Sequence, residues 1–471
     1  MKWDEFRKRG AEAAEWAADY HEGLRDRPVR AQSRPGEVLA QLPAAAPEAA
    51  EPLDDILADL DSTIMPGMTH WQHPRFFAYF PANAAPVSVL AEAYVSAMAA
   101  QCMLWQTSPA ATELETRVCD WLRQSVGLPE GFAGVIQDSA STATLCAVLT
   151  MRERALDWAG NRKGLSGQPR LRIYASAEVH TSIDRAIWIA GIGEENLVRI
   201  PTNGPMRAMD SDALRDAIAA DRIAGHLPAG IIACVGGTSA GATDDITAVM
   251  EVAEAEGLYS HVDAAWAGAA MICPEFQALW AGVERADSVV LNPHKWLGAQ
   301  FDCTTHFLRD PTTLVKTLAI QPEYLKTHGA DGIINYSEWS VPLGRRFRAL
   351  KLWFLLRAHG LAELREMIRN HVAWADALCK RLEKLPQIEI VTQPFLSLFT
   401  FRLSAPEGGE SDALNQQAVN EINDEGRIYL TQTRIDGALV IRFQAGAWTC
   451  TKEDVDVAYD VIRETAERLC P

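Results

Sequence analysis

The sequence predicts an α/β protein in which a large domain with a mostly parallel sheet is followed by a smaller α+β domain. From about residue 86 onward, short apolar runs alternate with helical patterns, as they do in sheets whose strands are joined by helices. After residue 352 the pattern changes to strand-like runs followed by a terminal helix. At 471 residues the chain is too long for one core, and its 48% hydrophobic content can fill more than one.

Residues 1–85 are predicted to form an N-terminal helical segment. Apolar residues recur at helical spacing between Phe6 and Tyr20 and again between Leu53 and Ile64. Five prolines separate the two helices and indicate an extended connector, namely Pro28, Pro35, Pro43, Pro47 and Pro52. A segment of this kind buries few apolar contacts by itself. We therefore expect a partner subunit to cover it.

The large domain is predicted over residues 86–352 and the small domain over residues 353–471. Six apolar runs are expected as strands of the large sheet: 134–137, 171–175, 197–200, 230–235, 258–262 and 288–291. A helix is expected from residue 349 to a glycine stop at Gly360. In the small domain we expect strands at 397–403 and 439–443 and a terminal helix at 452–469.

Composition excludes several classes of protein. The formal net charge of −18, without a strong basic cluster, opposes binding to nucleic acid or to an anionic membrane. The sequence contains no stretch of about 18 apolar residues, and its N-terminus lacks the apolar centre of a signal peptide, so we expect a cytoplasmic protein. The nine cysteines and the histidines show no metal-ligand spacing, so no metal site is expected.

The strongest chemical signal is a lysine that follows one apolar run and a carboxylate that follows another. Lys295 lies in Asn-Pro-His-Lys-Trp directly after the run 288–291, and Asp263 ends the run 258–262. A lysine for an imine bond and an aspartate for a pyridinium nitrogen together indicate pyridoxal phosphate. Taken alone, such a lysine is more often an exposed residue at a strand end.

Two further segments fit the same cofactor. Residues 137–144 (QDSASTAT) follow one strand and open a helix, so free backbone N–H groups and hydroxyls could bind a phosphate there. A helix cap without a ligand is the alternative. His180 could lie flat against a pyridine ring, although an ordinary loop histidine fits as well. His261, directly before Val262 and Asp263, is interpreted as structural.

With these motifs in place, the chain resembles the group II pyridoxal-phosphate-dependent decarboxylases of the aromatic-L-amino-acid decarboxylase family over nearly its whole length. Five ordered segments carry the resemblance: 73–81, 108–115, 261–268, 292–297 and 342–348. The resemblance implies an aspartate aminotransferase-like fold of type I with a seven-stranded sheet, and a homodimer with shared active sites.

The resemblance also implies roles for individual residues. Lys295 would hold the cofactor as an imine, Asp263 would pair with its ring nitrogen, and His180 would stack on the ring. The remaining cofactor contacts would come from Ala140, Ser141, Thr238, Ala265, Asn292 and His294. The substrate pocket would be formed by Trp71, Tyr79, Phe80, Pro81, Met103, Phe301 and Gly344. Two departures from the family pattern, Ala82 and Gly237 in place of threonines, affect single polar contacts around this site.

The implied reaction is decarboxylation of an aromatic L-amino acid of the tryptophan, DOPA, tyrosine or phenylalanine type to its amine and carbon dioxide. Tyr324 would return a proton to the substrate Cα. Phe80, Trp71, Met103 and Phe301 suggest an aromatic-lined pocket, and Gly344 occupies a position where glycine goes with indole or catechol substrates.

Three alternatives remain open at this point. In an aromatic aldehyde synthase of the same family, phenylalanine typically replaces the tyrosine at position 324. In an aminotransferase of the same fold, Arg442 would bind the substrate carboxylate. A ligand-sensing regulator would need a basic DNA-binding module, which the acidic N-terminal region does not offer.

Overall fold

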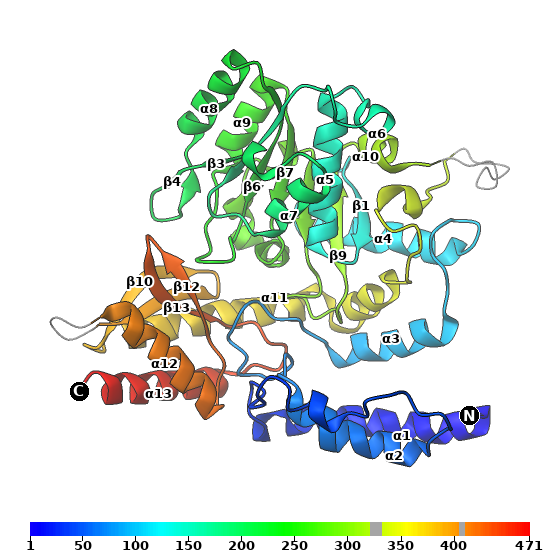
Figure 1. Ribbon diagram of the computed structural model, residues 1–471, viewed down its shortest axis with the longest axis vertical. Coiled ribbons are helices and arrows are strands. Elements are labelled where there is room, and N and C mark those ends of the chain that lie inside the picture. The colour runs from blue at the N-terminus through cyan, green and yellow to red at the C-terminus, as the bar shows by residue number, and fades with distance from the viewer. Residues whose placement is uncertain (321–331, 405–409) are drawn as a thin grey trace. The chain divides into compact units, whose positions relative to one another are not determined.

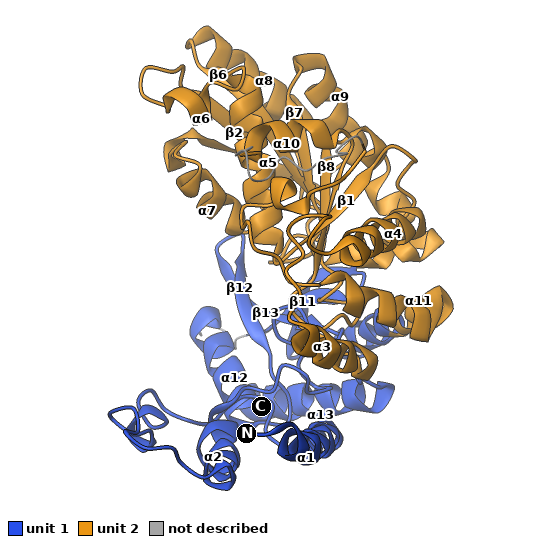
Figure 2. Cartoon of the chain, turned by 90° about the vertical axis from the view of Figure 1, so that its right-hand side faces the viewer, with its two compact units in different colours: residues 1–81, 371–471 blue, residues 82–370 orange. Residues whose placement is uncertain are grey.

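The computed structural model describes residues 1–320, 332–404 and 410–471, and the chain divides into two compact units (Figure 2). Unit 1 comprises residues 1–81 with 371–471, and unit 2 comprises residues 82–370. Tyr324 lies outside the described residues. Within the described ranges, no helix is both long and apolar enough to cross a lipid bilayer, and no group of three or more candidate ligands could hold a metal ion.

Unit 2 is built on a seven-stranded sheet with the strand order β1-β9-β8-β7-β6-β2-β3 (Figure 1). The strands are β1 (Ala133–Gln137), β2 (Leu171–Ser176), β3 (Leu197–Ile200), β6 (Leu227–Cys234), β7 (Tyr259–Asp263), β8 (Ser288–Leu291) and β9 (Thr304–Leu308). The pairs β2–β3, β2–β6, β6–β7 and β7–β8 are parallel, whereas β9 pairs antiparallel with both β1 and β8. The predicted fold, a mostly parallel sheet in an α/β domain, is confirmed.

Strand burial explains why six of these strands could be read from the sequence. Residues 288–291 and 259–263 are buried throughout, as expected for strands covered on both faces by helices. β9 escaped the sequence analysis because Thr304, Thr305 and His306 look polar, yet all three side chains are fully buried. The short pair β4 (Thr202–Asn203) and β5 (Ala208–Met209) was not predicted either.

The helix α5 (Ala140–Ala155) packs against the central strands of the sheet. A Cβ atom added to Gly230 of β6 would lie 2.4 Å from Sδ of Met151, so glycine is needed where this helix meets the strand. Other helices of unit 2 are α3 (Pro86–Met98), α4 (Pro109–Ser125), α6 (Gly160–Lys163), α7 (Ser182–Ile189), α8 (Ser211–Ile223), α9 (Ile246–Glu256) and α10 (Pro311–Leu318).

Unit 1 contains the smaller α+β fold. Its antiparallel sheet has the order β10-β11-β13-β12, made of β10 (Ile388–Phe395), β11 (Leu398–Leu403), β12 (Thr431–Ile435) and β13 (Ala438–Gln444). Phe77, Phe399, Phe401 and Phe443 form part of a core with α12 (Ser411–Glu425) and α13 (Lys452–Leu469). A capping box between Thr451 and Asp454 begins α13 where the sequence predicts it.

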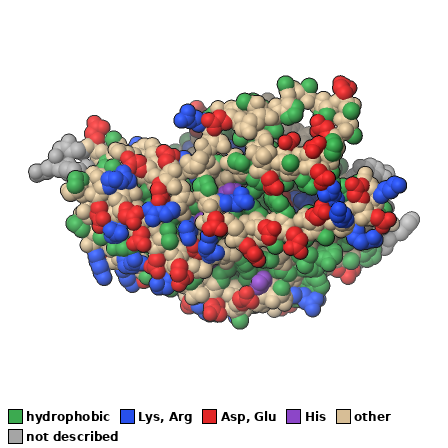
Figure 3. Space-filling model, turned by 90° about the horizontal axis from the view of Figure 1, so that it is seen from below, with side chains coloured by type: hydrophobic (Ala, Val, Ile, Leu, Met, Phe, Trp, Pro, Cys, Tyr) green, Lys and Arg blue, Asp and Glu red, His purple; other side chains and the backbone are tan. Residues whose placement is uncertain are grey.

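The N-terminal part of unit 1 exposes apolar side chains. α1 (Trp3–Glu22) and α2 (Leu53–Asp59), all of whose residues are described, contain no buried side chain. Trp16 Nε1 donates a hydrogen bond to Asp61 and Arg9 pairs with Asp54, so the two helical stretches lie together. Trp3 is 80% exposed, and Figure 3 shows hydrophobic side chains among the charged ones on one face of the molecule.

The two units differ from the predicted division at residues 1–85, 86–352 and 353–471. The N-terminal segment and the C-terminal domain belong to one unit, and its second part begins at residue 371 rather than 353. The cause lies in α11 (Ala349–Leu382), which continues past the predicted stop. Gly360 does adopt a left-handed φ of 65°, as a helix-ending glycine would, but the chain resumes helical structure directly after it.

Candidate active site

The predicted site residues Asp263 and Lys295 follow neighbouring parallel strands of unit 2. Asp263 of β7 is in register with Val290 of β8, so the loops that follow both strands leave the same edge of the sheet. The N–H of Asn292 donates to the carbonyl of Ala265 over 2.9 Å and ties the two loops together. The N–H of Lys295 then donates to Asn292 O over 3.0 Å, which makes a tight turn at the lysine.

Asn83, which sequence analysis did not single out, anchors the lysine turn. Its backbone N–H donates to His294 O over 3.0 Å, and its side-chain amide donates to Lys295 O over 2.8 Å. The side chain of Asn83 is fully buried. Only its place just after the 73–81 motif could have pointed to it. The backbone around Lys295 is therefore held from both sides.

Asp263 and Lys295 both act on His180, which follows β2. The Nδ1 atom of His180 lies 2.9 Å from Ser182 Oγ and accepts the Ser182 N–H over 3.2 Å, so the ring is held in place. Partial burial lowers the pKa of His180, while the charge of Asp263 raises it and that of Lys295 lowers it. The side chain nevertheless remains accessible to solvent. The three predicted catalytic residues that the structure describes thus lie at the carboxyl ends of parallel strands of one sheet.

The carboxylate of Asp263 is almost buried, with 9% of the residue exposed. Its Oδ1 atom accepts the Ala265 N–H over 3.0 Å, which fixes the plane of the carboxylate. This contact involves Oδ1, one of the two carboxylate oxygens. Ala265, a predicted cofactor contact, therefore helps to orient Asp263 through its backbone.

The start of α5 provides the predicted phosphate-binding groups. Ser139 is the N-cap, and its hydroxyl accepts the Thr142 N–H over 3.2 Å. The first helical bond runs from Ala143 N to Ser139 O, so the amides of Ala140 and Ser141 precede it at the positive end of the helix. These two amides and the exposed hydroxyl of Ser141 suit an anion.

Asn292 and His294 are held by the strand β9 and the loop before it. Thr304 Oγ1 donates to Asn292 Oδ1 over 2.9 Å, and Cys303 N–H donates to His294 Nδ1 over 3.0 Å. Burial, followed by the charge of Lys295, lowers the pKa of His294 to about 3. The imidazole is therefore neutral, and because Nδ1 is an acceptor, Nε2 carries the hydrogen.

Thr238 lies in a tight loop after β6, in which the N–H groups of Gly236 and Gly237 both point to Ala242 O. A Cβ atom at Gly237 would lie 3.1 Å from Glu178 O and 3.2 Å from Ala242 Cβ. Crowding thus explains glycine where the family pattern has threonine. Thr238 remains partly accessible beside it.

This donor set fits pyridoxal 5′-phosphate. It offers an amine for an imine bond, a buried carboxylate for a ring nitrogen, an imidazole for the ring face, and a helix N-terminus for the phosphate. All of these groups belong to unit 2 and lie after strands of one sheet.

The predicted substrate residues fall into two groups. In unit 2, Phe301 packs edge-on against His294, with ring centroids 4.8 Å apart, so this residue borders the cofactor site. Gly344 faces Gln101, whose Nε2 would lie 3.2 Å from an added Cβ atom. Met103 accepts the Ser337 N–H at its carbonyl and is partly accessible.

The second group lies in unit 1. Trp71 stacks on Tyr79, with ring centroids 5.7 Å apart. Arg442 lies 5.4 Å from the ring centroid of Phe80 and donates to Thr431 Oγ1 and to the carbonyl of Tyr79. Arg442 is thus a buried support for the segment that contains Tyr79, Phe80 and Pro81, and these contacts do not favour a carboxylate-binding role.

A buried ion pair that sequence analysis missed links two of the recognised motifs. Arg345 Nη2 lies 2.7 Å from Glu115 Oε1, and both side chains are almost fully buried. Both also bond β1, since Glu115 accepts the Ile136 N–H and Arg345 donates to Ile136 O. The pair therefore fixes the loop of Gly344 to α4 and the sheet.

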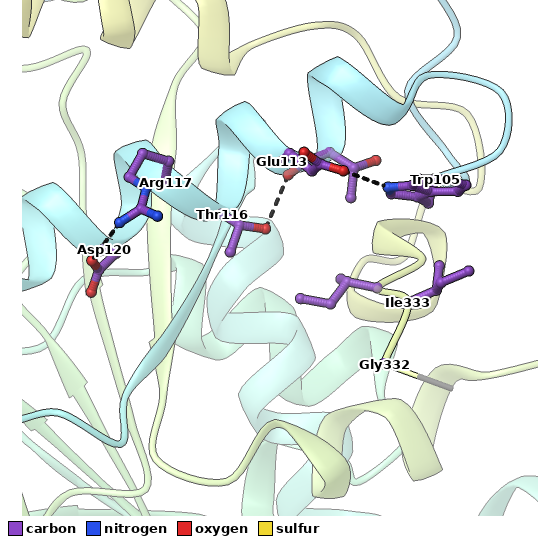
Figure 4. Close-up of a pocket in the computed structure, with 9 residues that line it drawn as sticks. Trp105, Glu113, Thr116, Arg117, Asp120, Gly332 and Ile333 are labelled. Atoms are coloured by element: carbon purple, nitrogen blue, oxygen red, sulfur yellow. Dashed lines mark hydrogen bonds and ion pairs between the residues drawn. The ribbon is translucent and has the colours of Figure 1, made fainter. Parts of the chain in front are cut away.

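A cavity of about 610 Å³ lies along the exposed side of α4 (Figure 4). Its polar groups already bond within the wall: Trp105 Nε1 donates to Glu113 over 3.0 Å, and Arg117 pairs with Asp120. Thr116 donates to the carbonyl of Thr112. These contacts give no indication of a ligand, and none of the predicted site residues that the structure describes lines the cavity.

Comparison with known proteins identifies relatives of the whole chain. The pyridoxal-dependent decarboxylase conserved domain matches residues 35–404. A tryptophan decarboxylase of Camptotheca acuminata is 37% identical, covering 99% of this chain and 95% of the relative. The aromatic-L-amino-acid decarboxylase of Mus musculus is 38% identical, covering 99% of this chain and 98% of the relative. A phenylacetaldehyde synthase of Petunia hybrida is 36% identical, covering 99% and 95%.

Two solved structures with similar names closely match the fold of this chain. The tryptophan decarboxylase of Catharanthus roseus in complex with L-tryptophan has a TM-score of 0.94 and 35% identity, covering 100% of this chain and 99% of that one. The Oryza sativa protein solved with PLP and tryptamine has a TM-score of 0.96 and 35% identity, with the same coverage.

Replacing Glu115 by Gln should strongly destabilise the protein, because the Arg345 guanidinium would remain buried without its anion. We expect the free energy of unfolding to fall by about 3 kcal/mol. Glu113→Gln, on the exposed side of the same helix, is the control and should change it by less than about 1 kcal/mol. Denaturant unfolding followed by circular dichroism measures both, and equal stability of the two variants would contradict a structural role for the ion pair.

Proposed function

The chain belongs to the family of pyridoxal-dependent decarboxylases, and from this premise we propose the residues that carry its reaction. The protein is a pyridoxal-phosphate-dependent carboxy-lyase that converts an aromatic L-amino acid to its amine and carbon dioxide. The observation that carries the proposal is that Lys295, Asp263 and His180 lie at the carboxyl ends of parallel strands in one sheet of unit 2, with Asp263 and the loop of Lys295 on neighbouring strands.

Each residue of the site has a proposed task. Bound pyridoxal phosphate supplies an electron sink for the bond that breaks at the substrate Cα. Lys295 Nζ would hold the cofactor by an imine bond, and Asp263 would keep a proton at its ring nitrogen. His180 would lie against the ring face. The amides of Ala140 and Ser141 bind the phosphate, with Asn292, the Nε2–H of His294 and Thr238 as further polar contacts.

Orientation decides which bond of the substrate breaks. The bond to the carboxylate must stand perpendicular to the cofactor ring for decarboxylation. On the basis of the family resemblance, we propose that apolar and aromatic residues hold the substrate side chain in this pose, namely Trp71, Tyr79, Phe80, Pro81, Met103 and Phe301. The family resemblance at Gly344, where glycine goes with indole or catechol substrates, supports a side chain of that kind.

A proton must then reach Cα. Tyr324 is proposed as the donor on the basis of the family resemblance, because a phenol can deliver a proton and a phenylalanine at the same position cannot. This residue also separates the two activities found among the relatives, since decarboxylases and phenylacetaldehyde synthases both occur among them.

We also propose a homodimer in the cytoplasm. The exposed apolar residues of α1 and α2 support it, since apolar patches of this kind usually meet a partner surface. Trp71, Tyr79 and Phe301 are exposed by 40% or more, so parts of the proposed pocket also have room for a cover from a second subunit. All nine cysteines are free and buried, as suits a reducing compartment.

Covalent attachment at Lys295 gives the direct test of the proposed chemistry. Borohydride reduction of the purified enzyme should place a pyridoxyl group on Lys295, as peptide mapping by mass spectrometry would show. Lys295→Ala should retain its fold and lose carbon dioxide release from tryptophan, DOPA and phenylalanine. Lys351, buried in an ion pair with Glu92, is an internal control that should stay unlabelled. Labelling at another lysine would refute the assignment.

A Tyr324→Phe variant tests the choice between amine and aldehyde. Without the phenolic proton, we expect amine formation to fall by about 100-fold or more. Dioxygen would then take two electrons from the decarboxylated substrate and form hydrogen peroxide, and water would hydrolyse the resulting imine to the aldehyde and ammonia. Quantifying these products by chromatography and a peroxidase assay checks the outcome. If wild type already releases the aldehyde as its main product, the chain is an aldehyde synthase.

Mixed dimers test whether active sites are shared. Lys295→Ala subunits are to be exchanged separately with Trp71→Ala and with Met103→Ala subunits. If a pocket residue acts on the neighbour's lysine, random mixing should restore activity to about one quarter of wild type, since half the dimers are mixed and each has one intact site. Recovery in one of the two mixtures identifies the segment that crosses the interface. Verified mixed dimers without recovery in either would contradict sharing.

A further inference from the structure

The face of the sheet beneath α5 carries a row of polar side chains that ends at the active site. Tyr259, His261 and Asp263 alternate along β7, so they point to the same face. His261 is in register with Ile232 of β6, which packs in one core cluster with Met151 of α5. The row therefore lies under α5, with Asp263 at its open end.

His261 is fully buried, and only one of its ring nitrogens has a partner among the described residues. Its Nδ1 atom lies 2.7 Å from Ser288 Oγ of β8, whereas no hydrogen-bond partner is found for Nε2. Burial lowers the pKa of His261 to about 4, and the negative charge of Asp263 raises it. The ring is therefore neutral, and because His261 and Asp263 are two residues apart on β7, the two side chains are neighbours on the same face of the strand.

His306 of β9 lies beside His261. Its Cα is in register with Val290 of β8, which is itself in register with Asp263. The two imidazoles meet edge to face, with ring centroids 5.9 Å apart and an angle of 89° between the planes. Among the described residues, neither nitrogen of His306 has a hydrogen-bond partner.

Stability does not explain two imidazoles at this position. A buried polar atom without a partner loses the hydrogen bonds that it makes with water in the unfolded chain, so apolar side chains of similar volume would make a more stable core. Exceptions of this kind point to a role outside folding. The charged residue that follows His261 on this face of β7 is Asp263, and its register partners on β6 and β8 are Cys234 and Val290.

We propose that His261 is a positioning residue for Asp263, and that His306 holds the His261 ring in the orientation this requires. When the Ser288 hydroxyl donates to Nδ1, Nε2 carries the hydrogen, and the dipole of the neutral ring stabilises a nearby anion. The carboxylate would thereby be held in the direction of the cofactor's ring nitrogen. The inference rests on the role of Asp263 proposed above.

Two substitutions separate the nitrogens of His261. In His261→Asn, the side-chain amide can replace Nδ1 toward Ser288 but does not reach the position of Nε2. In His261→Gln, the longer side chain places its amide nitrogen near the position of Nε2. A purely structural contact with Ser288 is therefore kept by the first variant, and the proposed action on Asp263 by the second.

Cofactor affinity provides a readout independent of turnover. Apo forms of wild type and both variants are titrated with pyridoxal phosphate and with its 1-deaza analogue, which has carbon in place of the ring nitrogen. For His261→Asn we expect pyridoxal phosphate to bind about tenfold more weakly and the analogue to bind as it does to wild type. His261→Gln should stay within about threefold of wild type for both compounds.

Asp263→Asn separates this inference from the role of Asp263 on which it rests. This variant should lose affinity for pyridoxal phosphate and not for the deaza analogue. If it loses affinity for neither, the role of Asp263 fails and the inference with it. If Asp263→Asn shows the nitrogen-dependent loss and His261→Asn does not, the positioning role alone is wrong. Equal losses of both compounds in His261→Asn would show packing and overturn the proposal.

His306→Phe gives a second route in case His261→Asn does not fold, as judged by its thermal unfolding and circular dichroism. Phenylalanine fills a similar volume without unpaired nitrogens, so we expect the apo variant to unfold at a higher temperature than wild type. Pyridoxal phosphate should nevertheless bind about threefold more weakly, with the deaza analogue unaffected. A more stable variant with wild-type affinity for both compounds would remove His306 from the mechanism.

Discussion

The parallel pairing of β6, β7 and β8 is the constraint on which the site depends. Because their carboxyl ends leave one edge of the sheet, Asp263 and the turn of Lys295 become neighbours although 31 residues separate them in sequence. The bond from Asn292 to Ala265 then fixes one loop against the other, and Asn83 holds the lysine turn. His180 joins them because β2 pairs with β6 in the same direction.

Sequence reasoning predicted the parts of the fold whose physics is local. The strands at 197–200 and 288–291 and the helix at 452–469 have the predicted bounds, because apolar runs and a capping box mark them. β9 could not be predicted from its own residues. Thr304, Thr305 and His306 are polar, and they are buried because the strand pairs with β1 and β8 inside the sheet. The helix after Gly360 was missed because its continuation depends on packing in unit 1 rather than on the glycine itself.

The sequence pointed to the residue types that the proposed cofactor site needs, but not to the contacts that hold those residues in place. The cofactor needs a lysine, an aspartate, a histidine and the start of a helix, and each of these can be recognised in the sequence from a local motif. Asn83 and the Glu115–Arg345 pair act through contacts between distant segments, and Cys303 acts through its backbone N–H, so nothing local in the sequence marks them. The substrate residues lie in both units, so their common role stays a prediction.

Two parts of α5, its first turn and its middle, have different partners. Its first turn offers amides to an anion, and its middle covers buried strands of the sheet, including the one that contains His261. A molecule held at that first turn therefore stabilises the whole sheet by mass action, since it binds the folded chain and not the unfolded one. Where vitamin B6 is scarce, more of the protein would open and meet proteases. Cellular abundance of the enzyme should then follow nutrition even at constant gene expression.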